Sequence, residues 1–257
     1  MTLRLAVVGF PVGHSRSPVI HEAALEAVGL RATYDLLEVD EDGMRRVVSD
    51  IRSGDLDGVN VTMPYKGIAH DLCDRVSAAA SRARSVNTIV GEDGQVRGYS
   101  TDITGLKDVW ASHQLPNDRP VLVLGNGGAA AAALIALDRD EVYGSCRRDG
   151  GVSELAERTG CAVIPVPWGA GVTEAVVVNA TPLGMSEEPL PEKVTAVWSG
   201  LVDMPYRSGD TPAVTKARDD SVPYVDGLDL LVAQAAESFS LWTGLEAPVE
   251  VMRQAAR

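Results

Sequence analysis

The chain of 257 residues carries a formal net charge of -13 and has a pI near 4.7. This excess of negative charge disfavours binding to phosphate backbones and to anionic lipid surfaces, because long-range repulsion opposes both. With 45% hydrophobic and 23% charged residues, the composition is that of a globular protein with a sizeable core. We therefore expect neither nucleic acid nor a membrane surface as a partner.

The cysteines Cys73, Cys146 and Cys161 are widely spaced and include no CxxC pair. Neither a disulfide framework nor a zinc site is expected, and no metal is predicted. The first apolar run is too short for a signal-peptide core, and no stretch approaches the ~20 apolar residues of a membrane span. These features predict a cytoplasmic protein with reduced thiols.

Short apolar runs rich in β-branched residues alternate with longer helical patterns along the chain. This alternation is typical of strands joined through helices into mostly parallel sheets, and it predicts the α/β class. The length exceeds the usual ~100 to 200 residues of one domain, which favours two domains. In the first half the predicted strands are 3–8, 33–39, 58–61 and 86–90, and the predicted helices are 19–28, 42–53 and 69–83. The EDGQ sequence at 92–95 predicts a hairpin, so this sheet is expected to be mixed.

A polar, proline-bearing segment at 112–120 is interpreted as a linker to a second series of elements. The predicted strands of this series are 121–124, 141–145, 162–164, 175–179, 201–202 and 223–225. Two amphipathic helices, 228–242 and 247–256, are predicted near the end of the chain. Chain order alone does not assign these helices to either domain.

The predicted strand 121–124 leads directly into the sequence GNGGAAAAAL. Gly125, Gly127 and Ala130 occupy the three small-residue positions of a dinucleotide-binding fingerprint. Gly125 permits a tight turn, Gly127 lets backbone amides approach a pyrophosphate, and Ala130 allows close packing of helix on sheet. A glycine-rich helix start without a ligand is the alternative interpretation. The position of this loop, between a buried strand and an Ala-rich helix, favours the interpretation that it binds a dinucleotide cofactor.

The residues after strand 141–145 indicate which cofactor binds. In a protein that binds NAD, an acid at this place holds the ribose hydroxyls. Here Cys146, Arg147 and Arg148 follow the strand instead. Two guanidiniums can bind a 2'-phosphate through planar, bidentate contacts, so the pattern predicts NADP. Two solvated loop arginines are the alternative, and Asp149 beside them could weaken the preference.

The N-terminal sequence GFPVGHSRSPVIH places Ser15 and Ser17 between a strand end and a helix whose first turn contains Pro18. Taken alone, Ser17 is interpreted as the N-cap of that helix. The two hydroxyls can equally donate to a carboxylate held at the positive end of the helix. The two interpretations are compatible.

The sequence NVTMPYK follows a short apolar strand, where ligand groups gather in open α/β sheets. Asn60 and Thr62 alternate with apolar residues and are expected to face one side. Lys66 is one of only four lysines, against nineteen arginines. A partly desolvated lysine can act as an acid or a base, whereas arginine stays charged. A surface lysine is the alternative.

Further polar residues occur at predicted element ends. Asn87 is expected to end a strand together with Thr88, and Asp102 begins a helical pattern. Asp102 is either a helix N-terminal acid or a partner that orients Lys66 and accepts a substrate hydroxyl proton. Gln234 lies in a predicted helix, where a buried amide needs partners that a ligand hydroxyl can supply.

Seven segments, in order, resemble the shikimate dehydrogenase family across nearly the whole chain: GFPVGHSRSPVIH, NVTMPYK, SVNT, STD, GNGGAAAAA, VVNATPLGM and LLVAQAAESFSLWTG. The resemblance implies an enzyme of aromatic amino acid biosynthesis that reversibly oxidises shikimate to 3-dehydroshikimate with NADP, in the cleft between two domains. It implies a substrate-binding domain at 1–104 with 227–257 and a Rossmann-type NADP-binding domain at 105–226. The expected assembly is a monomer or a homodimer.

The resemblance also implies the site residues. Lys66 and Asp102 would form the catalytic pair, and the sequence leaves open which of them transfers the proton. The expected substrate-binding residues are Ser15, Ser17, Asn60, Thr62, Asn87, Tyr206 and Gln234. The expected cofactor-binding residues are Gly125, Gly127, Gly128, Ala129, Arg147, Arg148, Asn179, Ala180, Thr181 and Gly227.

Three positions depart from the family pattern: Ser100 and Cys146 replace asparagines, and Leu230 replaces a methionine. None of these changes removes a catalytic group. Three alternatives stay open, namely a quinate/shikimate dehydrogenase using NAD, a non-catalytic NADP-binding paralogue, and a dehydrogenase acting on a folate or an amino-shikimate analogue. The branch that uses quinate and NAD resembles a pattern with threonine at the position of Ser17 and an acid near Arg147. This chain has neither feature, which argues against that branch.

Overall fold

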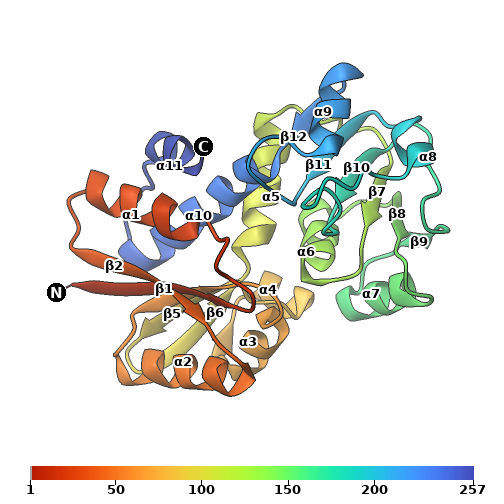
Figure 1. The fold of residues 1–257 in the computed structure, drawn as a ribbon. Helices are drawn as coiled ribbons and strands as arrows, with labels where there is room; N and C mark the ends of the chain where they lie inside the picture. The colour runs from red at the N-terminus through yellow and green to blue at the C-terminus, as the bar shows by residue number, and fades with distance from the viewer. Residues whose placement is uncertain (1) are drawn as a thin grey trace. The chain divides into compact units, whose positions relative to one another are not determined.

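The computed structural model describes residues 2–257, which form two compact α/β units (Figure 1). Unit 1 contains the residues up to Gly105 together with Leu231–Arg257, and unit 2 contains Leu106–Leu230. The boundaries fall inside helices α5 (Thr101–Ser112) and α10 (Gly227–Thr243). The polar segment 112–120, predicted as a linker, instead lies wholly within unit 2. Among residues 2–257, no helix is both long and apolar enough to cross a membrane.

Unit 1 is built on a mixed six-stranded sheet in the order β2-β1-β3-β5-β6-β4. The strands are β1 Leu3–Gly9, β2 Ala32–Glu38, β3 Gly58–Val61, β4 Arg75–Val76, β5 Thr88–Glu92 and β6 Gln95–Tyr99. β1 runs parallel to β2 and β3, whereas β5 runs antiparallel to β3 and β6. Asp93 and Gly94 both have positive φ at the β5–β6 turn, which matches a hairpin turn and confirms the predicted mixed sheet.

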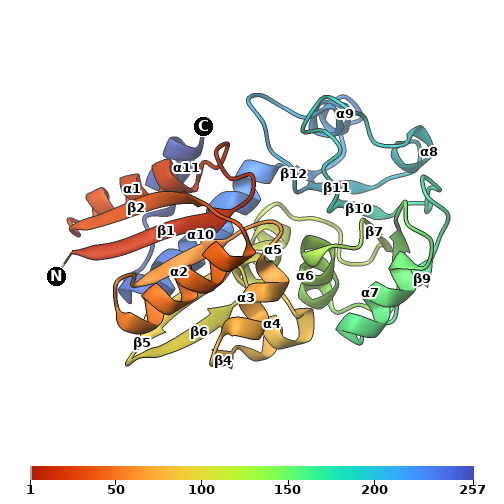
Figure 2. The ribbon, with the colours of Figure 1, turned by 60° about the horizontal axis from the view of Figure 1, so that its bottom comes forward.

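Helices cover both faces of this sheet (Figures 1 and 2). They are α1 Ser17–Ala27, α2 Glu41–Ser53, α3 Lys66–Leu72, α4 Ala78–Ala83, α11 Val249–Ala256 and the unit 1 parts of α5 and α10. On one face, Met44 and Ile51 of α2 join a buried apolar cluster with strand residues and with α3. On the other face, Ile20 of α1, Phe239 of α10 and Met252 of α11 form a second cluster. Burial of these apolar side chains stabilises the unit and fixes the strand ends that carry the site.

The helix predicted at 69–83 is wrong, because α3 and α4 are separate helices with strand β4 between them. Asp74 holds the interruption, since its carboxylate accepts a hydrogen bond from Val96 N–H and pairs with Arg52. Ser77 then caps α4 by accepting from Ala80 N–H. Pairing of β4 with β6 therefore overrides the local helical preference.

The strand predicted at 86–90 begins later, at Thr88, so Thr88 opens β5 and Asn87 directly precedes it, instead of both residues ending a strand. The antiparallel register nevertheless pairs Thr88 with Asn60, at the carboxyl end of β3. The polar residues are thus brought together because the end of β3 lies beside the start of β5, and not because both strands end at the same edge of the sheet.

Unit 2 contains a six-stranded parallel sheet in the order β12-β11-β10-β7-β8-β9. Its strands are β7 Val121–Leu124, β8 Val142–Ser145, β9 Ile164–Pro165, β10 Val176–Asn179, β11 Gly200–Asp203 and β12 Tyr224–Val225. Each of the six overlaps a predicted strand, although β9 shares only Ile164 with the strand predicted at 162–164. The order reverses between β7 and β10, and the carboxyl ends of strands at such a reversal are where nucleotides bind in open sheets.

Four helices lie wholly within unit 2: α6 Gly128–Leu137, α7 Gly151–Thr159, α8 Glu192–Thr195 and α9 Pro212–Asp219. Helices α8 and α9 bury Val194 and Val214 against Leu122 and Val177 of the sheet. Helix α6 contacts β7 and α7, and its alanines from Ala130 onward are buried. This dense Ala-rich packing holds the glycine loop between β7 and α6 against the sheet edge.

Candidate active site and cofactor loop

Lys66 and Asp102 form an ion pair in unit 1. Lys66 is the first residue of α3, and Asp102 lies in the first turn of α5. Lysine Nζ lies 2.6 Å from Asp102 Oδ2, and the two side chains are 22% and 21% exposed. The structure therefore brings together the two residues expected to be catalytic, in a partly desolvated position that a ligand can still reach.

The side chain of Asn87 contacts the other oxygen of Asp102. Its Nδ2 donates to Asp102 Oδ1 at 3.1 Å and lies 2.9 Å from Thr101 Oγ1 and 3.2 Å from Gln234 Oε1. Its Oδ1 accepts from the backbone N–H of Thr101 at 2.7 Å. A backbone N–H only donates, so this bond defines which end of the amide faces Asp102. Asp102 is thus held by Lys66 on one oxygen and by Asn87 on the other.

Gln234 reaches this group because α5 and α10 approach each other closely. A Cβ atom on Gly105 would lie 2.8 Å from the backbone nitrogen of Gln234, a distance that only glycine tolerates. Gln234 is buried, and its Nε2 donates to the carbonyl of Leu231 at 2.9 Å. This leaves Oε1 directed at Asn87.

Asn60 is buried at the carboxyl end of β3, and protein groups engage both ends of its amide. Its Oδ1 accepts from the Tyr34 hydroxyl at 2.7 Å. Its Nδ2 lies 3.1 Å from Thr88 Oγ1, 3.0 Å from Ser238 Oγ and 3.3 Å from the carbonyl of Asn87. Asn60 therefore joins Lys66 and Asp102 only through the residues around Asn87.

Three buried hydroxyls that the sequence did not single out for the site link these amides. Oγ1 of Thr88 lies 2.8 Å from Ser238 Oγ and 3.1 Å from Thr101 Oγ1. Ser238 also donates to the carbonyl of Gln234 at 3.0 Å. Sequence signals could have revealed two of them, because Thr101 directly precedes Asp102 and Ser238 lies four residues after Gln234 on the same helix face.

The N-terminal loop differs from the prediction at Ser17. Ser17 is the first residue of α1 and Arg16 is its N-cap, so the assignment of Ser17 as N-cap is wrong. Arg16 already has helical φ and ψ, which starts the helix at Ser17, and Ser15 Oγ accepts from Ser17 N–H at 3.2 Å. Pro18 lies in the first turn, as predicted.

Thr62 lies next to the strand that leads into this loop. A Cβ atom on Gly9 would lie 2.3 Å from the Thr62 methyl group, so the glycine makes room for the threonine side chain. Within residues 2–257 no hydrogen bond joins Thr62 to Ser15 or Ser17. These three hydroxyls are therefore less tightly connected than the group around Asn87.

The glycine loop of unit 2 has the geometry that a dinucleotide phosphate requires. Gly125 has φ of +112°, and a Cβ there would lie 2.8 Å from the carbonyl oxygen of Ala180. Gly127 is the N-cap of α6 and provides no side-chain cap, and a Cβ on it would meet nothing within 4 Å. Gly128 and Ala129 begin α6, where backbone amides have no acceptor within the helix, and this fits a phosphate group.

Arg158 supports the same loop from α7. Its Nη2 donates to the carbonyls of Asn126 at 3.1 Å and Gly127 at 3.2 Å. The sequence did not reveal this residue, because more than thirty residues separate it from the loop it contacts.

Asn179 shapes the loop that follows β10. It is fully buried, and its Nδ2 donates to Asp203 Oδ1 at 2.6 Å and to the carbonyl of Leu183 at 3.0 Å. Its Oδ1 accepts from the backbone N–H and the hydroxyl of Thr181. Asn179 thereby fixes the segment that places the Ala180 carbonyl against Gly125. Burial raises the pKa of its partner Asp203 to about 6.

The two arginines after β8 have different surroundings, although both are exposed. Arg148 forms a double ion pair with Glu154, with Nη1 2.9 Å from Oε1 and Nη2 in contact with Oε2. The guanidinium carbon of Arg147 lies 5.3 Å from the ring centroid of Trp168. Of the two, only Arg147 has its charge uncompensated by a direct ion pair within residues 2–257.

The remaining predicted residues, Tyr206 and Gly227, both lie in unit 2. Tyr206 is partly buried and follows β11. Gly227 begins α10, and a Cβ there would lie 2.3 Å from the carbonyl oxygen of Pro205. Gly227 thus lets the start of α10 pack directly against the segment that leads to Tyr206.

Comparisons with known proteins agree with this arrangement. Family models described as "Shikimate dehydrogenase substrate binding domain" and "Shikimate 5'-dehydrogenase C-terminal domain" match residues 7–89 and 227–257. Proteins named shikimate dehydrogenase (NADP(+)) from Anaeromyxobacter sp. and Exiguobacterium sibiricum are 36% and 32% identical, each over 99% of this chain and 95% and 98% of their own lengths. A crystal structure of shikimate 5-dehydrogenase from Thermus thermophilus in complex with NADP(H) and shikimate has a TM-score of 0.90 and 35% identity, covering 99% of this chain and 98% of that one. The chain therefore belongs to the shikimate dehydrogenase family.

Proposed function

We propose that this protein is an NADP-dependent shikimate dehydrogenase, which reversibly oxidises shikimate to 3-dehydroshikimate in aromatic amino acid biosynthesis. The observation that carries the proposal is the partly exposed pair of Lys66 and Asp102, 2.6 Å apart, in a chain of this family. A non-catalytic paralogue would have no need to keep this pair together.

The pair performs the proton transfer of the reaction. NADP supplies the acceptor for the hydride that leaves C3 of shikimate. As the hydride leaves, the 3-hydroxyl loses its proton to the coupled pair of Lys66 and Asp102, and the reverse reaction returns it. Asn87 holds Oδ1 of Asp102, which leaves the Lys66 side of the carboxylate to face the substrate hydroxyl.

The substrate is held by groups at both ends of its ring. We assign its carboxylate to the hydroxyls of Ser15 and Ser17, at the start of α1, and of Thr62, which lies against Gly9 at the end of β1. We assign its hydroxyls to Asn87 and Gln234, beside the ion pair. Asn60 contributes through its hydrogen bonds to this group, and Tyr206 is assigned to the substrate on the family resemblance alone.

The cofactor is held by unit 2. The backbone amides of Gly127, Gly128 and Ala129 bind the pyrophosphate at the start of α6, with Gly125 forming the turn. The loop of Asn179, Ala180 and Thr181 supports the cofactor, together with Gly227. Arg147 binds the 2'-phosphate, with Arg148 beside it.

The protein is assigned to the cytoplasm. Cys73, Cys146 and Cys161 are all free thiols, which is consistent with the reducing environment of the cytoplasm. Assembly as a monomer or a homodimer is proposed on the family resemblance alone.

The test is an absorbance assay of reduced nicotinamide with shikimate and quinate, each offered with NADP and with NAD. The proposal predicts rapid turnover with shikimate and NADP. Turnover only with quinate and NAD would replace it with the quinate enzyme, and tight NADP binding without turnover on either acid would identify a non-catalytic paralogue.

A further inference from the structure

We propose that Trp168 sets the cofactor preference of this protein by holding the guanidinium of Arg147 ready for the 2'-phosphate of NADP, and that Glu188 opposes this preference. Neither Trp168 nor Glu188 belongs to the glycine fingerprint or to the arginine pair that follows β8. The inference rests on the proposed function, because it concerns how the same site distinguishes NADP from NAD.

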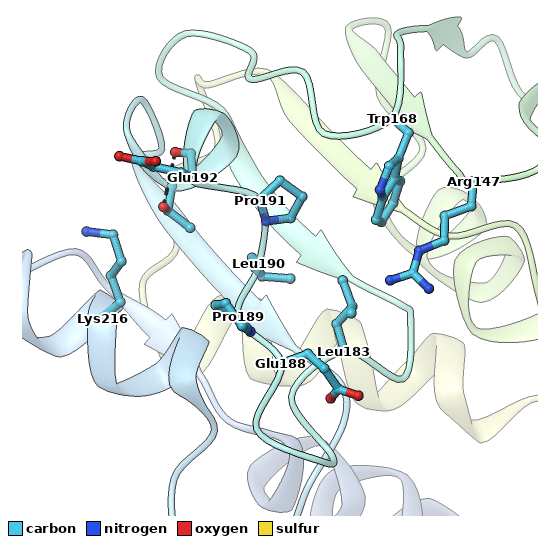
Figure 3. Close-up of a pocket in the computed structure, with 10 residues that line it drawn as sticks. Arg147, Trp168, Leu183, Glu188, Pro189, Leu190, Pro191, Glu192 and Lys216 are labelled. Carbon is cyan, nitrogen blue, oxygen red and sulfur yellow. Dashed lines mark hydrogen bonds between the residues drawn. The ribbon is translucent and has the colours of Figure 1, made fainter.

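The three residues line one cavity of about 560 Å³ in unit 2 (Figure 3). Figure 3 shows the Arg147 side chain extending toward the Trp168 ring, with Leu183 and Glu188 beyond its guanidinium group. Each residue comes from a different loop: Arg147 follows β8, Trp168 follows β9, and Glu188 lies between β10 and α8. The cavity thus gathers a cation, an aromatic face and an anion at the place where a 2'-phosphate is expected.

The contact between Arg147 and Trp168 is a cation–π interaction, with 5.3 Å from the guanidinium carbon to the ring centroid. Stacking uses the flat face of the guanidinium and leaves its edge N–H groups free to bind a phosphate in a bidentate manner. Arg147 makes no hydrogen bond within residues 2–257, so the indole is the contact that restricts its position. Restricting a long side chain before binding reduces the entropy lost on binding.

Arg148 is less suited to this task. Its guanidinium is engaged by both carboxylate oxygens of Glu154, and this hydrogen bonding raises the pKa of Arg148. A phosphate would have to compete with that carboxylate for the same N–H groups. The discrimination therefore rests mainly on Arg147 and on the ring that holds it.

Glu188 brings a carboxylate to the same cavity from a loop about forty residues after Arg147. Hydrogen bonds from its own backbone N–H and from Ser186, together with the charge of Arg147, hold the pKa of Glu188 below its usual range. It is therefore ionised near neutral pH. A 2'-phosphate at Arg147 is repelled by this charge, whereas the uncharged 2'-hydroxyl of NAD is not.

The first experiment measures the ratio of kcat/KM with NADP to kcat/KM with NAD, using shikimate as substrate. Trp168→Leu should lower this ratio by about two- to fivefold, the scale of an exposed cation–π contact. Trp168→Phe keeps an aromatic face and should stay within about twofold of the parent ratio. Glu188→Gln should raise the ratio by about twofold or more, because it removes a like charge.

A matched control is available in the second half of unit 2, where Arg218 stacks on Tyr224 at 5.8 Å. Neither residue lines the cavity. Tyr224→Leu should leave the ratio unchanged. If Trp168 only supports packing, Trp168→Leu will impair both cofactors equally and leave the ratio unchanged, which would overturn the proposal. Should Trp168→Leu fail to fold, a fall or no change in the ratio for Glu188→Gln would overturn the part assigned to Glu188.

A binding experiment separates this inference from the proposed function. Calorimetry compares adenosine 2',5'-bisphosphate with adenosine 5'-monophosphate, and neither fragment requires shikimate. The affinity for the bisphosphate should be highest in the parent, lower in Trp168→Phe and lowest in Trp168→Leu. The affinity for the monophosphate should be the same in all three proteins. This pattern without shikimate turnover would reject the proposed function and keep the inference. Equal weakening of both fragments, or no change in either, would reject the inference.

Discussion

Nζ of Lys66 lies 2.6 Å from Oδ2 of Asp102, while Oδ1 of the same carboxylate accepts a hydrogen bond from Asn87. The two oxygens of Asp102 are thus divided between the lysine proposed to share in proton transfer and the amide that holds the carboxylate in place.

Replacing Lys66 by alanine should lower kcat by about a hundredfold or more, with a smaller change in KM, because general acid–base help is lost while most substrate contacts remain. Steady-state kinetics with shikimate and NADP measure this effect. Lys107→Ala, which removes an exposed lysine from α5, serves as the control and should leave kcat unchanged. An unaltered kcat in Lys66→Ala would reject the catalytic assignment.

Thr101→Val should lower kcat/KM for shikimate by about tenfold, because Asn87 loses a buried hydrogen-bond acceptor and its amide is less firmly held toward Asp102. Thr101→Ser keeps the hydroxyl and should restore most of the activity. The control is Thr159→Val, which removes a buried hydroxyl bonded to backbone carbonyls of α7. If the two valine variants lose stability and activity in parallel, Thr101 has a structural role only.

Gly105→Ala should destabilise the protein by about 1 to 3 kcal/mol, because the new methyl group would lie 2.8 Å from the backbone nitrogen of Gln234 and force α5 and α10 apart. Activity should fall as well, since Gln234 would move away from Asn87. Denaturant unfolding measures the stability. Gly67→Ala, in helix α3 with open space at its Cβ, should instead leave stability unchanged or slightly higher. Equal effects of the two alanines would contradict the close approach.

The stability of the protein should depend on pH through Asp203. Its folded-state pKa of about 6 lies above the ordinary value of 3.8, because burial disfavours the charged form. Between these pH values the folded state binds more protons than the unfolded state, so this contribution to the free energy of unfolding falls as pH rises from about 4 to above 6. The full decrease is about 3 kcal/mol.

Urea unfolding at several pH values between 4 and 7 measures this dependence. The difference between the parent and Asp203→Asn isolates the contribution of the buried carboxyl. Asp219→Asn changes an exposed acid on α9 and should follow the parent curve. A constant difference between the parent and Asp203→Asn across the range would show that Asp203 does not titrate in this window.

Sequence patterns predicted the elements whose determinants are local. The buried strand β7, the turn at Gly125 and the Ala-rich helix α6 follow each other within seventeen residues, and all three were predicted. The helix predicted at 69–83 failed because its interruption depends on Asp74 contacting Arg52 and Val96, about twenty residues away in either direction. Short-range periodicity carries no information about such contacts.

The same distinction applies to the site. Lys66 and Asp102 stand in motifs and were selected from the sequence. Ser238 was not predicted because it contacts Asn60, which lies 178 residues away in the sequence. Trp168 was not predicted because nothing in its own segment indicates that it faces Arg147. Glu188 is the clearest example of a residue that local sequence does not reveal. No acid directly follows β8 in the sequence, but the fold brings Glu188 to the same cavity from another loop.

Unit 2 is one continuous stretch of chain, whereas unit 1 is assembled from two stretches separated by 125 residues. During synthesis the whole of unit 2 is made before α10 is complete, so it can acquire its structure while unit 1 still lacks Gln234, Ser238 and α11. The nucleotide-binding half can therefore mature first on the ribosome. The acid–base pair obtains its last polar neighbours only when the final helices fold back, so chains cut short in this region should be able to bind nucleotide yet be unable to turn over.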